Sequence, residues 1–265
     1  MSSIQPAPQQ GSTLFQTERQ RQIASLTLQE GRVEVAELSD RFNVTTETIR
    51  RDLSHLQRQQ LLRRVHGGAV PMDHHGFEPL VAVRIDQHDS EKRRIARLAV
   101  REITRDSAVM IDSGSTLTRL AEVLPVDMNL RVVTNSLITA QVLADKEGVN
   151  VLVLGGEVRR NTLAMVDADT VASVRPLTVD TLFISSDAAS ANGLTTPYSE
   201  EAALKRAMIT SARRVIALVD HFKFVEDHFI RFAEWSDIDL LITNSDLDPK
   251  VVRQVEAAGT SVALA

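Results

Sequence analysis

The sequence contains no cysteine, which excludes disulfide bonds and thiolate chemistry and fits a reducing cytoplasm. A membrane-spanning helix needs about 20 consecutive apolar residues, and no apolar run in this sequence is nearly that long. The first residues also lack the charged-then-apolar pattern of a secretion signal. A Gly-x-Gly-x-x-Gly fingerprint and a Walker loop are also missing, so a dinucleotide or nucleoside triphosphate site is not indicated. We therefore expect a cytoplasmic protein that has no cofactor and does not bind membranes.

Lysine is missing from the first third of the chain, where every basic side chain before Lys92 is an arginine. Residues 1–70 carry nine arginines against seven acidic residues, a balance of +2, whereas the whole chain has a net charge of -5. A mildly basic N-terminal part on an acidic body predicts that only this part meets a polyanion. The planar guanidinium group suits phosphates and guanine edges better than an ammonium group does.

The N-terminal part has the pattern of a winged helix-turn-helix domain. A first helix, which ends near Gly31, has the spacing of a capping box at Thr17-Glu18-Arg19-Gln20. A second helix is expected from about Val35 to Phe42, and after a short turn Thr45 caps a third helix. That third helix buries its apolar face, and residues 61–70 then form a two-stranded wing.

A capped helix that carries adjacent arginines, with a basic wing behind it, is what recognition of double-stranded DNA needs. The alternative interpretation is a small helical domain whose arginines are only solvated. Asp52 is expected to pair with an arginine, and His66 either contacts DNA or only shapes the hairpin. The predicted DNA-binding residues are Thr45, Thr46, Glu47, Thr48, Arg50, Arg51 and Ser54 on the helix, and Arg63, Arg64, His66, Gly67 and Gly68 on the wing.

The remainder of the chain alternates apolar strand candidates with helical segments, which predicts a mostly parallel sheet covered by helices on both faces. Two adjacent histidines, His74 and His75, have no further ligand cluster near them, so no metal site is assigned. Trp235 is expected in the core or at a subunit interface. The strand candidates are Ala108–Ile111, Leu130–Val133, Val151–Leu154, Thr181–Ile184, Val215–Val219, Leu240–Thr243 and Ser261–Leu264.

Small and hydroxyl-bearing residues follow three of these strands, where ligands bind in parallel α/β folds. Together they favour a ligand with a phosphate group, because helix N-termini and small residues let backbone amides approach an anion. Taken singly, each is also explained as a turn or a cap. Lys205 and Lys223 are cationic candidates, although Lys205 can be solvated and Lys223 can pair with Asp220. The predicted effector-binding residues are Asp112, Ser113, Gly114, Ser115, Thr116, Thr134, Asn135, Ser136, Gly155, Gly156, Lys205, Asp220 and Lys223.

Thr48-Ile49-Arg50-Arg51-Asp52-Leu53 and His66-Gly67-Gly68-Ala69 resemble the signature of the DeoR family of bacterial transcriptional regulators, and the resemblance extends from about Glu18 to Ala265. It implies a repressor of carbohydrate-metabolism genes that a phosphorylated sugar or related metabolite releases from DNA. The body is similar to the ribose-5-phosphate isomerase and CoA-transferase fold. The resemblance implies effector contacts from Asp112, Gly114, Ser115, Thr116, Asn135, Gly156, Lys205, Asp220 and Lys223.

The chain departs from the family pattern at two positions of the expected pocket. Asp167 stands where the family usually has glycine, and Ser185-Ser186-Asp187 replaces a glycine-rich strand end. Larger and more acidic groups there would shrink or recharge the pocket, which favours a smaller or less anionic ligand.

The fold class that follows is α/β, with a winged helix-turn-helix before a Rossmann-like sensor domain. We expect a disordered leader over 1–16, the DNA-binding domain over 17–72, a linker over 73–89 and an effector-sensing and oligomerisation domain over 90–265. The expected partners are double-stranded operator DNA, a phosphorylated sugar or sugar acid, and further copies of the chain in a dimer or tetramer. One alternative is an enzyme resembling a sugar-phosphate isomerase with an accessory DNA-binding head. Another is a DNA-binding module that senses nothing.

Overall fold

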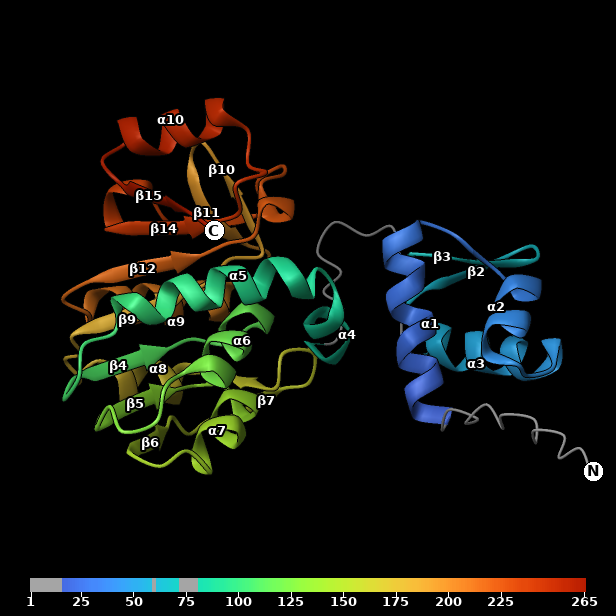
Figure 1. The fold of residues 1–265 in the computed structure, drawn as a ribbon, viewed down its shortest axis with the longest axis horizontal. Coiled ribbons are helices and arrows are strands. Elements are labelled where there is room, and N and C mark those ends of the chain that lie inside the picture. The colour runs from blue at the N-terminus through green and yellow to red at the C-terminus, as the bar shows by residue number, and fades with distance from the viewer. Residues whose placement is uncertain (1–15, 59–60, 72–80) are drawn as a thin grey trace, which may run out of the picture. The chain divides into compact units, whose positions relative to one another are not determined.

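The computed structural model describes residues 16–58, 61–71 and 81–265, and the chain divides into two units, Met1–Phe77 and Glu78–Ala265 (Figure 1). The predicted leader, 1–16, lies outside the described residues except for Gln16. His74 and His75 lie outside them as well. The two units are described separately below.

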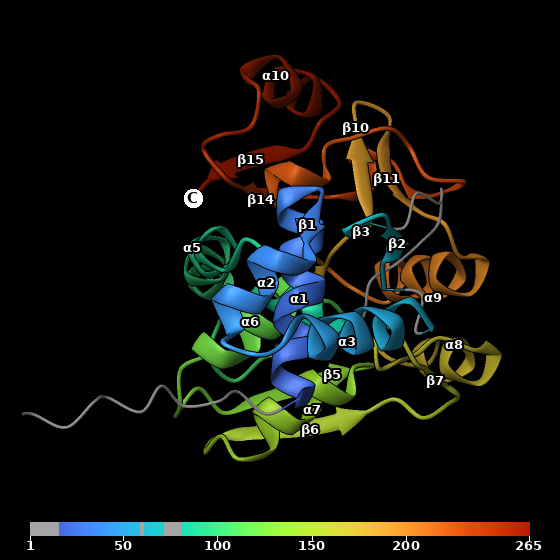
Figure 2. The ribbon, with the colours of Figure 1, turned by 90° about the vertical axis from the view of Figure 1, so that its right-hand side faces the viewer.

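The N-terminal unit combines helices with a small antiparallel sheet (Figure 2). Its strand order is β1-β3-β2, so the predicted two-stranded wing has a third strand, because Val33 pairs with Ala69. The predicted second and third helices are confirmed. The described elements are α1 (Gln16–Glu30), β1 (Val33–Glu34), α2 (Val35–Phe42), α3 (Thr46–Arg58), β2 (Arg63–Val65) and β3 (Gly68–Val70).

A buried carboxylate joins the first and third helices of this unit. Asp52 on α3 is 1% exposed and accepts hydrogen bonds from Nε of Arg19 and Nε2 of Gln20, both at 2.7 Å. The expected arginine partner of Asp52 therefore comes from α1. The predicted capping box is wrong, because α1 begins at Gln16 and Thr17 lies inside it. The amide of Gln20 instead donates to the carboxylate of Asp52, and a buried carboxylate requires such donors.

The C-terminal unit is built on a seven-stranded parallel sheet of order β15-β14-β12-β9-β4-β5-β6. Each of the seven predicted strand segments supplies one strand, with ends that differ by at most two residues. The strands are β4 (Ala108–Ile111), β5 (Leu130–Thr134), β6 (Val149–Val153), β9 (Thr181–Ile184), β12 (Val215–Leu218), β14 (Leu240–Thr243) and β15 (Ser261–Leu264).

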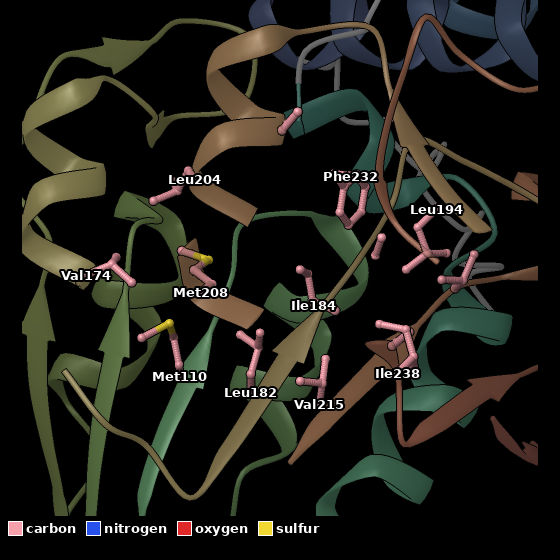
Figure 3. Close-up of a cluster of buried hydrophobic side chains, with 14 of the residues drawn as sticks. Met110, Val174, Leu182, Ile184, Leu194, Leu204, Met208, Val215, Phe232 and Ile238 are labelled. Carbon is pink, nitrogen blue, oxygen red and sulfur yellow. The ribbon is translucent and has the colours of Figure 1, made fainter. Parts of the chain in front are cut away.

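Helices cover both faces of this sheet, as the sequence predicts. Along β9, Leu182 and Ile184 point into one core (Figure 3). Phe183, which lies between them, belongs to the other core, because neighbouring side chains of a strand alternate between faces. The core with Phe183 is completed by α5 (Asp89–Ala99), α6 (Ser115–Val123) and α7 (Leu137–Ala144). The core with Leu182 is completed by α8 (Ala168–Val174), α9 (Ser199–Thr210) and α10 (Pro249–Ala257).

Several short elements of this unit were not predicted. Helix α4 (Val81–Asp86) occupies part of the expected linker, 73–89, because Val81 and Val83 are buried. Trp235 belongs to the core and donates to the carbonyl of Ser190 at 2.9 Å. The further elements are β7 (Val158–Arg159), β8 (Ala164–Met165), β10 (Ala188–Ser190), β11 (Gly193–Thr196), β13 (Ile230–Ala233), and the 3-10 helices η1 (Val100–Glu102), η2 (His221–Lys223) and η3 (Trp235–Asp237).

None of the helices in the described ranges combines the length and the apolarity that crossing a bilayer requires.

Candidate functional site

Helix α3 presents a polar face to solvent in the N-terminal unit. Asn43 adopts a left-handed conformation, with φ of 50°, and turns the chain from α2 into α3. Thr45 then caps α3, since its Oγ1 accepts the backbone N–H of Thr48 at 3.2 Å. Ile49 is buried beneath this face. The predicted DNA-binding residues that it leaves exposed or half-buried are Thr45, Thr46, Glu47, Thr48, Arg50, Arg51 and Ser54.

The wing is tied to this helix by side-chain hydrogen bonds. Nη1 of Arg64 donates to Oγ of Ser54 at 2.7 Å, and Ser54 donates to the carbonyl of Arg50 at 2.7 Å. The backbone N–H of Arg64 donates to Oε1 of Gln57 at 3.2 Å. These bonds fix the basic edge of β2 against α3, so that the helix and the wing form one surface.

Not every wing residue of the predicted set faces solvent. Arg63, His66 and Gly67 are exposed, but Gly68 is buried. A Cβ atom on Gly68 would lie 1.9 Å from the carbonyl oxygen of Val33 on the neighbouring strand. The prediction that Gly68 contacts DNA is therefore not supported by its position, and the glycine is explained by the close approach of β1 and β3.

In the C-terminal unit, the chain reverses its path across the sheet between β4 and β9. From β4 it continues to β5 and β6 on one side, and it later returns to β9 on the other side of β4. All strands of the sheet are parallel, so the carboxyl ends of β4 and β9 lie at the same edge. Such a switch point is where ligands bind in open α/β sheets.

A narrow cavity of about 30 Å³ lies at this switch point. Gly114, with φ of +135°, precedes the first residue of α6 and turns the chain so that the helix N-terminus borders the cavity. Six predicted effector-binding residues line it, together with Ser185, Ser186 and Asp187, which the sequence marks as a departure from the family pattern at this pocket, and with three residues that the sequence did not indicate. The lining residues are Ser113, Gly114, Ser115, Thr116, Lys205 and Lys223, and Arg84, Thr162, Ser185, Ser186, Asp187 and Glu201.

Lys205 occupies the inner wall of the narrow cavity. Its ammonium group forms an ion pair with Asp112, which directly follows β4, and donates to the carbonyl of Ser185 at 3.0 Å. Both charged residues are buried, so the solvated alternative for Lys205 is wrong. Burial disfavours the ammonium form, but the carboxylates of Asp112 and Glu201 outweigh it and raise the pKa of Lys205.

Asp187 brings a negative charge into the same cavity, but cations surround it. Nη1 of Arg84 lies 3.6 Å from its Oδ1. Burial opposes ionisation of Asp187, yet Lys223, Arg84 and Lys205 together lower its pKa. Three cations, Arg84, Lys205 and Lys223, and two carboxylates, Asp187 and Glu201, therefore line the cavity, and the buried carboxylate of Asp112 balances the charge of Lys205.

Asp220 is buried beside the cavity lining rather than in it. Its Oδ1 has no hydrogen-bond partner among the described residues, and the nearby Lys92 donates to the carbonyls of Arg84 and Gln87. Burial lowers the pKa of Lys92 to about 8, although Asp220 opposes this effect. The alternative ion pair between Asp220 and Lys223 is not formed. Their contact is a backbone hydrogen bond of 3.0 Å.

The other predicted effector-binding residues have structural contacts away from the narrow cavity. Ser136 caps α7 and accepts the backbone N–H of Thr139, while Nδ2 of Asn135 donates to the carbonyl of Met165. The backbone N–H of Leu137 donates to the carbonyl of Leu163, and that of Met165 donates to the carbonyl of Asn135, so the segment 163–165 covers the end of β5. Gly155 and Gly156, which follow β6, are exposed but do not line the narrow cavity. The residues placed in this way are Thr134, Asn135, Ser136, Gly155 and Gly156.

A larger cavity, of about 280 Å³, adjoins the narrow one, and we call it the Tyr198 chamber. Glu201 lines both cavities. Asp167, the first departure from the family pattern, borders this chamber rather than the narrow cavity. The lining residues are Glu157, Val158, Arg159, Val166, Asp167, Tyr198, Glu200 and Glu201. Over the part of the chain that the structure describes, no group of three or more histidine, aspartate or glutamate side chains is arranged to hold a metal ion.

Comparison with known proteins gives the same division of the chain. Residues 19–75 match the family model described as the DeoR-like helix-turn-helix domain, and residues 87–245 match the DeoR C terminal sensor domain. A weak structural similarity is found to ribose 5 phosphate isomerase A from Neisseria gonorrhoeae, with a TM-score of 0.36 and 16% identity over 51% of this chain and 53% of that chain.

Several relatives match over nearly their whole length. The chain is 34% identical to the HTH-type transcriptional regulator GlpR of Haloferax volcanii, over 94% of this chain and 98% of that protein. It is 33% identical to the glycerol-3-phosphate regulon repressor of Escherichia coli, over 91% and 95%. It is 32% identical to the HTH-type transcriptional repressor GlcR of Bacillus subtilis, over 87% and 89%. The chain therefore belongs to the DeoR family, and it is a DNA-binding transcriptional regulator rather than an enzyme.

Proposed function

We propose that this protein represses a carbohydrate or sugar-acid catabolic operon and leaves its operator when a phosphorylated sugar-like effector binds. The observation that carries the proposal is that Arg84, Lys205 and Lys223 line the same cavity as the N-terminus of α6. The first N–H groups of a helix have no partner inside the helix, and together with cations they bind phosphate. Relatives named as repressors, among them that of the glycerol-3-phosphate regulon, support the same function.

At the operator, α3 enters the major groove and the arginines of the wing contact the phosphate backbone. A single DNA-binding unit offers few contacts, so a tight site requires at least two copies of the chain on repeated half-sites. The sensor domain is the element that holds these copies together in a dimer or tetramer. The complex forms in the cytoplasm, where the operator is accessible.

The effector releases the protein only if it binds the DNA-free state more tightly than the DNA-bound state. The narrow cavity is suited to such a difference, because its cations come from α4, α9 and η2. A phosphate group that contacts all three elements holds them in one arrangement. Helix α4 precedes the strands of the sheet in the chain, and its position relative to the sheet is the property that the effector sets.

The test begins with genomic fragments that the full-length protein selects from its own DNA. A fluorescence anisotropy titration measures affinity for the selected operator, and phosphorylated sugars and sugar acids are then added. We expect at least one of them to release the protein, while the corresponding unphosphorylated sugars do not. A protein that binds DNA but shows neither release nor a thermal shift with any phosphorylated compound would be a module that senses nothing. Turnover in an isomerisation assay would favour the enzyme alternative.

A further inference from the structure

The narrow cavity is too small for a whole phosphorylated sugar. Its volume is about 30 Å³, whereas pockets for small molecules usually measure about 300–1,000 Å³. Its lining is made of hydroxyl groups, a glycine and charged side chains, which fit a phosphate group and leave little room for a carbon skeleton. The part of the effector that is not phosphate must therefore extend into an adjoining space.

The Tyr198 chamber lies next to the narrow cavity. Its volume is about 280 Å³, and it shares Glu201 with the narrow cavity. On the chamber side, Glu201 forms an ion pair with Arg159, whose guanidinium group lies 3.4 Å from the centre of the Tyr198 ring. On the cavity side, Oγ1 of Thr196 lies 3.0 Å from Oε2 of Glu201 and 2.8 Å from Oδ2 of Asp187. The contacts from Arg159 through Glu201 and Thr196 to Asp187 thus form the boundary between the Tyr198 chamber and the narrow cavity.

The hairpin of β7 and β8 also borders both spaces. Val158 and Arg159 on β7 line the chamber, and Thr162 in the hairpin turn lines the narrow cavity. Thr162 is 4% exposed, and its Oγ1 has no hydrogen-bond partner within the described ranges. A ligand that spans the two spaces would supply the missing partner. The carbonyl of Asn161 in the same turn accepts the backbone N–H of Val81 at 2.7 Å, which connects the hairpin to the start of α4.

The chamber has the chemistry of a hydroxylated ligand rather than of a second phosphate. Its acidic side chains, at Glu157, Asp167, Glu200 and Glu201, outnumber the one cation, Arg159. Asp167 remains a carboxylate, since the backbone and side chain of Thr170 and the backbone of Glu157 donate to it and lower its pKa. Carboxylates repel a phosphate and accept hydrogen bonds from sugar hydroxyl groups.

Apolar groups complete the lining of the chamber. Val158, Val166 and the ring of Tyr198 provide surfaces against which the C–H groups of a sugar can pack. We propose that the Tyr198 chamber binds the hydroxyl-bearing carbon skeleton of an effector whose phosphate group lies in the narrow cavity. This inference rests on the proposed function and narrows it. The effector is a sugar phosphate long enough to pass Glu201, not a three-carbon phosphate.

The test compares probes of increasing length on the full-length protein by calorimetry. The probes are inorganic phosphate, glycerol 3-phosphate, ribose 5-phosphate, glucose 6-phosphate and fructose 6-phosphate. We expect at least one of the three sugar phosphates to bind at least about tenfold more tightly than inorganic phosphate and glycerol 3-phosphate, since the added groups fill an apolar pocket and make hydrogen bonds. Equal affinity for glycerol 3-phosphate and the best sugar phosphate would overturn the inference.

Val158→Trp then fills the chamber without touching the narrow cavity. Val158 is an exposed valine on β7, so a larger side chain there does not disturb the core. The variant should lose the tenfold advantage of the sugar phosphate and keep the affinity for inorganic phosphate. Val126→Trp, at an exposed valine that lines neither cavity, is the matched control and should bind every probe as the unmodified protein does.

Tyr198→Ala provides a second variant, and Tyr198→Phe should retain the binding of the sugar phosphate because the ring is kept. If Val158→Trp and Tyr198→Ala leave the sugar phosphate affinity unchanged, the chamber is not part of the site. If the unmodified protein binds no phosphate compound at all, including inorganic phosphate, the failure lies in the proposed function itself, and the inference fails with it.

Discussion

Lys205 on α9 forms a buried ion pair with Asp112, which follows β4 and lies 93 residues earlier in the chain. The pair connects the helix to the strand end at the switch point of the sheet. Because both groups are removed from water, neither charge is stable there without the other.

Lys205→Met should lower the free energy of unfolding by about 3–5 kcal/mol, because it leaves the carboxylate of Asp112 buried without its partner. Asp112→Leu should cost a similar amount for the opposite reason. The double variant should lose much less than the sum of the two, since neither charge of the pair then remains buried without its partner. Urea denaturation of the four proteins measures this coupling. Additive losses would show that the two side chains do not stabilise each other.

Much of the parallel sheet could be predicted from the sequence. A strand that is covered on both faces needs apolar side chains at consecutive positions, and runs such as Ala108–Ile111 and Val215–Leu218 therefore stand out. The position of the loop after β4 could also be predicted, because Ser113, Gly114, Ser115 and Thr116 line the narrow cavity. A run of small and hydroxyl residues at a strand-to-helix junction is a local feature of the sequence.

The rest of the site depends on contacts between distant segments, which the sequence pattern does not encode. Arg84 lies in a stretch that resembles a linker, and Glu201 resembles a solvated residue in the first turn of a helix. Thr162 lies in the turn between strands of two residues each, too short to show an alternating pattern. The position of Asn135 after a strand predicts a ligand contact, but its amide group donates a hydrogen bond to the carbonyl of Met165.

The two glycines of the wing should respond differently to substitution. Gly67 has φ of +79° and open space around a new Cβ, whereas a Cβ on Gly68 would clash with the backbone of Val33. Gly67→Ala should cost about 1–2 kcal/mol through its left-handed backbone, and Gly67→Asn should recover most of this because asparagine tolerates that conformation. Gly68→Ala and Gly68→Asn should both displace β3 from β1. Thermal unfolding of the four variants checks this, and recovery by Gly68→Asn would contradict it.

The buried lysine at position 92 predicts a rise in stability at alkaline pH. Its pKa is about 8 in the folded protein, below the value of about 10.4 that an unfolded lysine has. Between these two values the unfolded chain binds more protons than the folded one, so the free energy of unfolding increases as the pH rises. This increase in the free energy of unfolding is complete above the pKa of lysine in the unfolded chain, and it is absent below pH 8. It should reach on the order of 3 kcal/mol.

Urea denaturation between pH 7 and pH 10 measures this effect, and Lys92→Met should lose the increase. Lys250→Met is the matched control, because Lys250 is exposed on α10 and its substitution should leave the pH dependence unchanged. The same pH dependence in the Lys92→Met variant as in the unmodified protein would show that Lys92 is not the group that titrates.

DNA binding should depend on the first turns of α3. Arg50 and Arg51 are exposed there, and among the described residues the guanidinium group of Arg50 has only a long contact, of 3.7 Å, with Glu47. Both guanidinium groups can therefore turn toward DNA. Arg50→Ala or Arg51→Ala should cost about 1–3 kcal/mol of operator affinity if the arginine reads a base. A loss that is uniform across DNA sequences, with a smaller dependence on salt, would instead identify a phosphate contact.

Arg58→Ala is the matched control for these two variants, since Arg58 is exposed in the last turn of the same helix, away from the capped N-terminus that we propose enters the groove. Arg58→Ala removes the same charge from α3, but it should change operator affinity much less than Arg50→Ala or Arg51→Ala does. Anisotropy titrations at several salt concentrations separate the three variants, and unchanged thermal unfolding shows that the fold is intact. If all three arginines contribute equally and without sequence preference, α3 attracts DNA only by its charge, and the wing must provide the recognition.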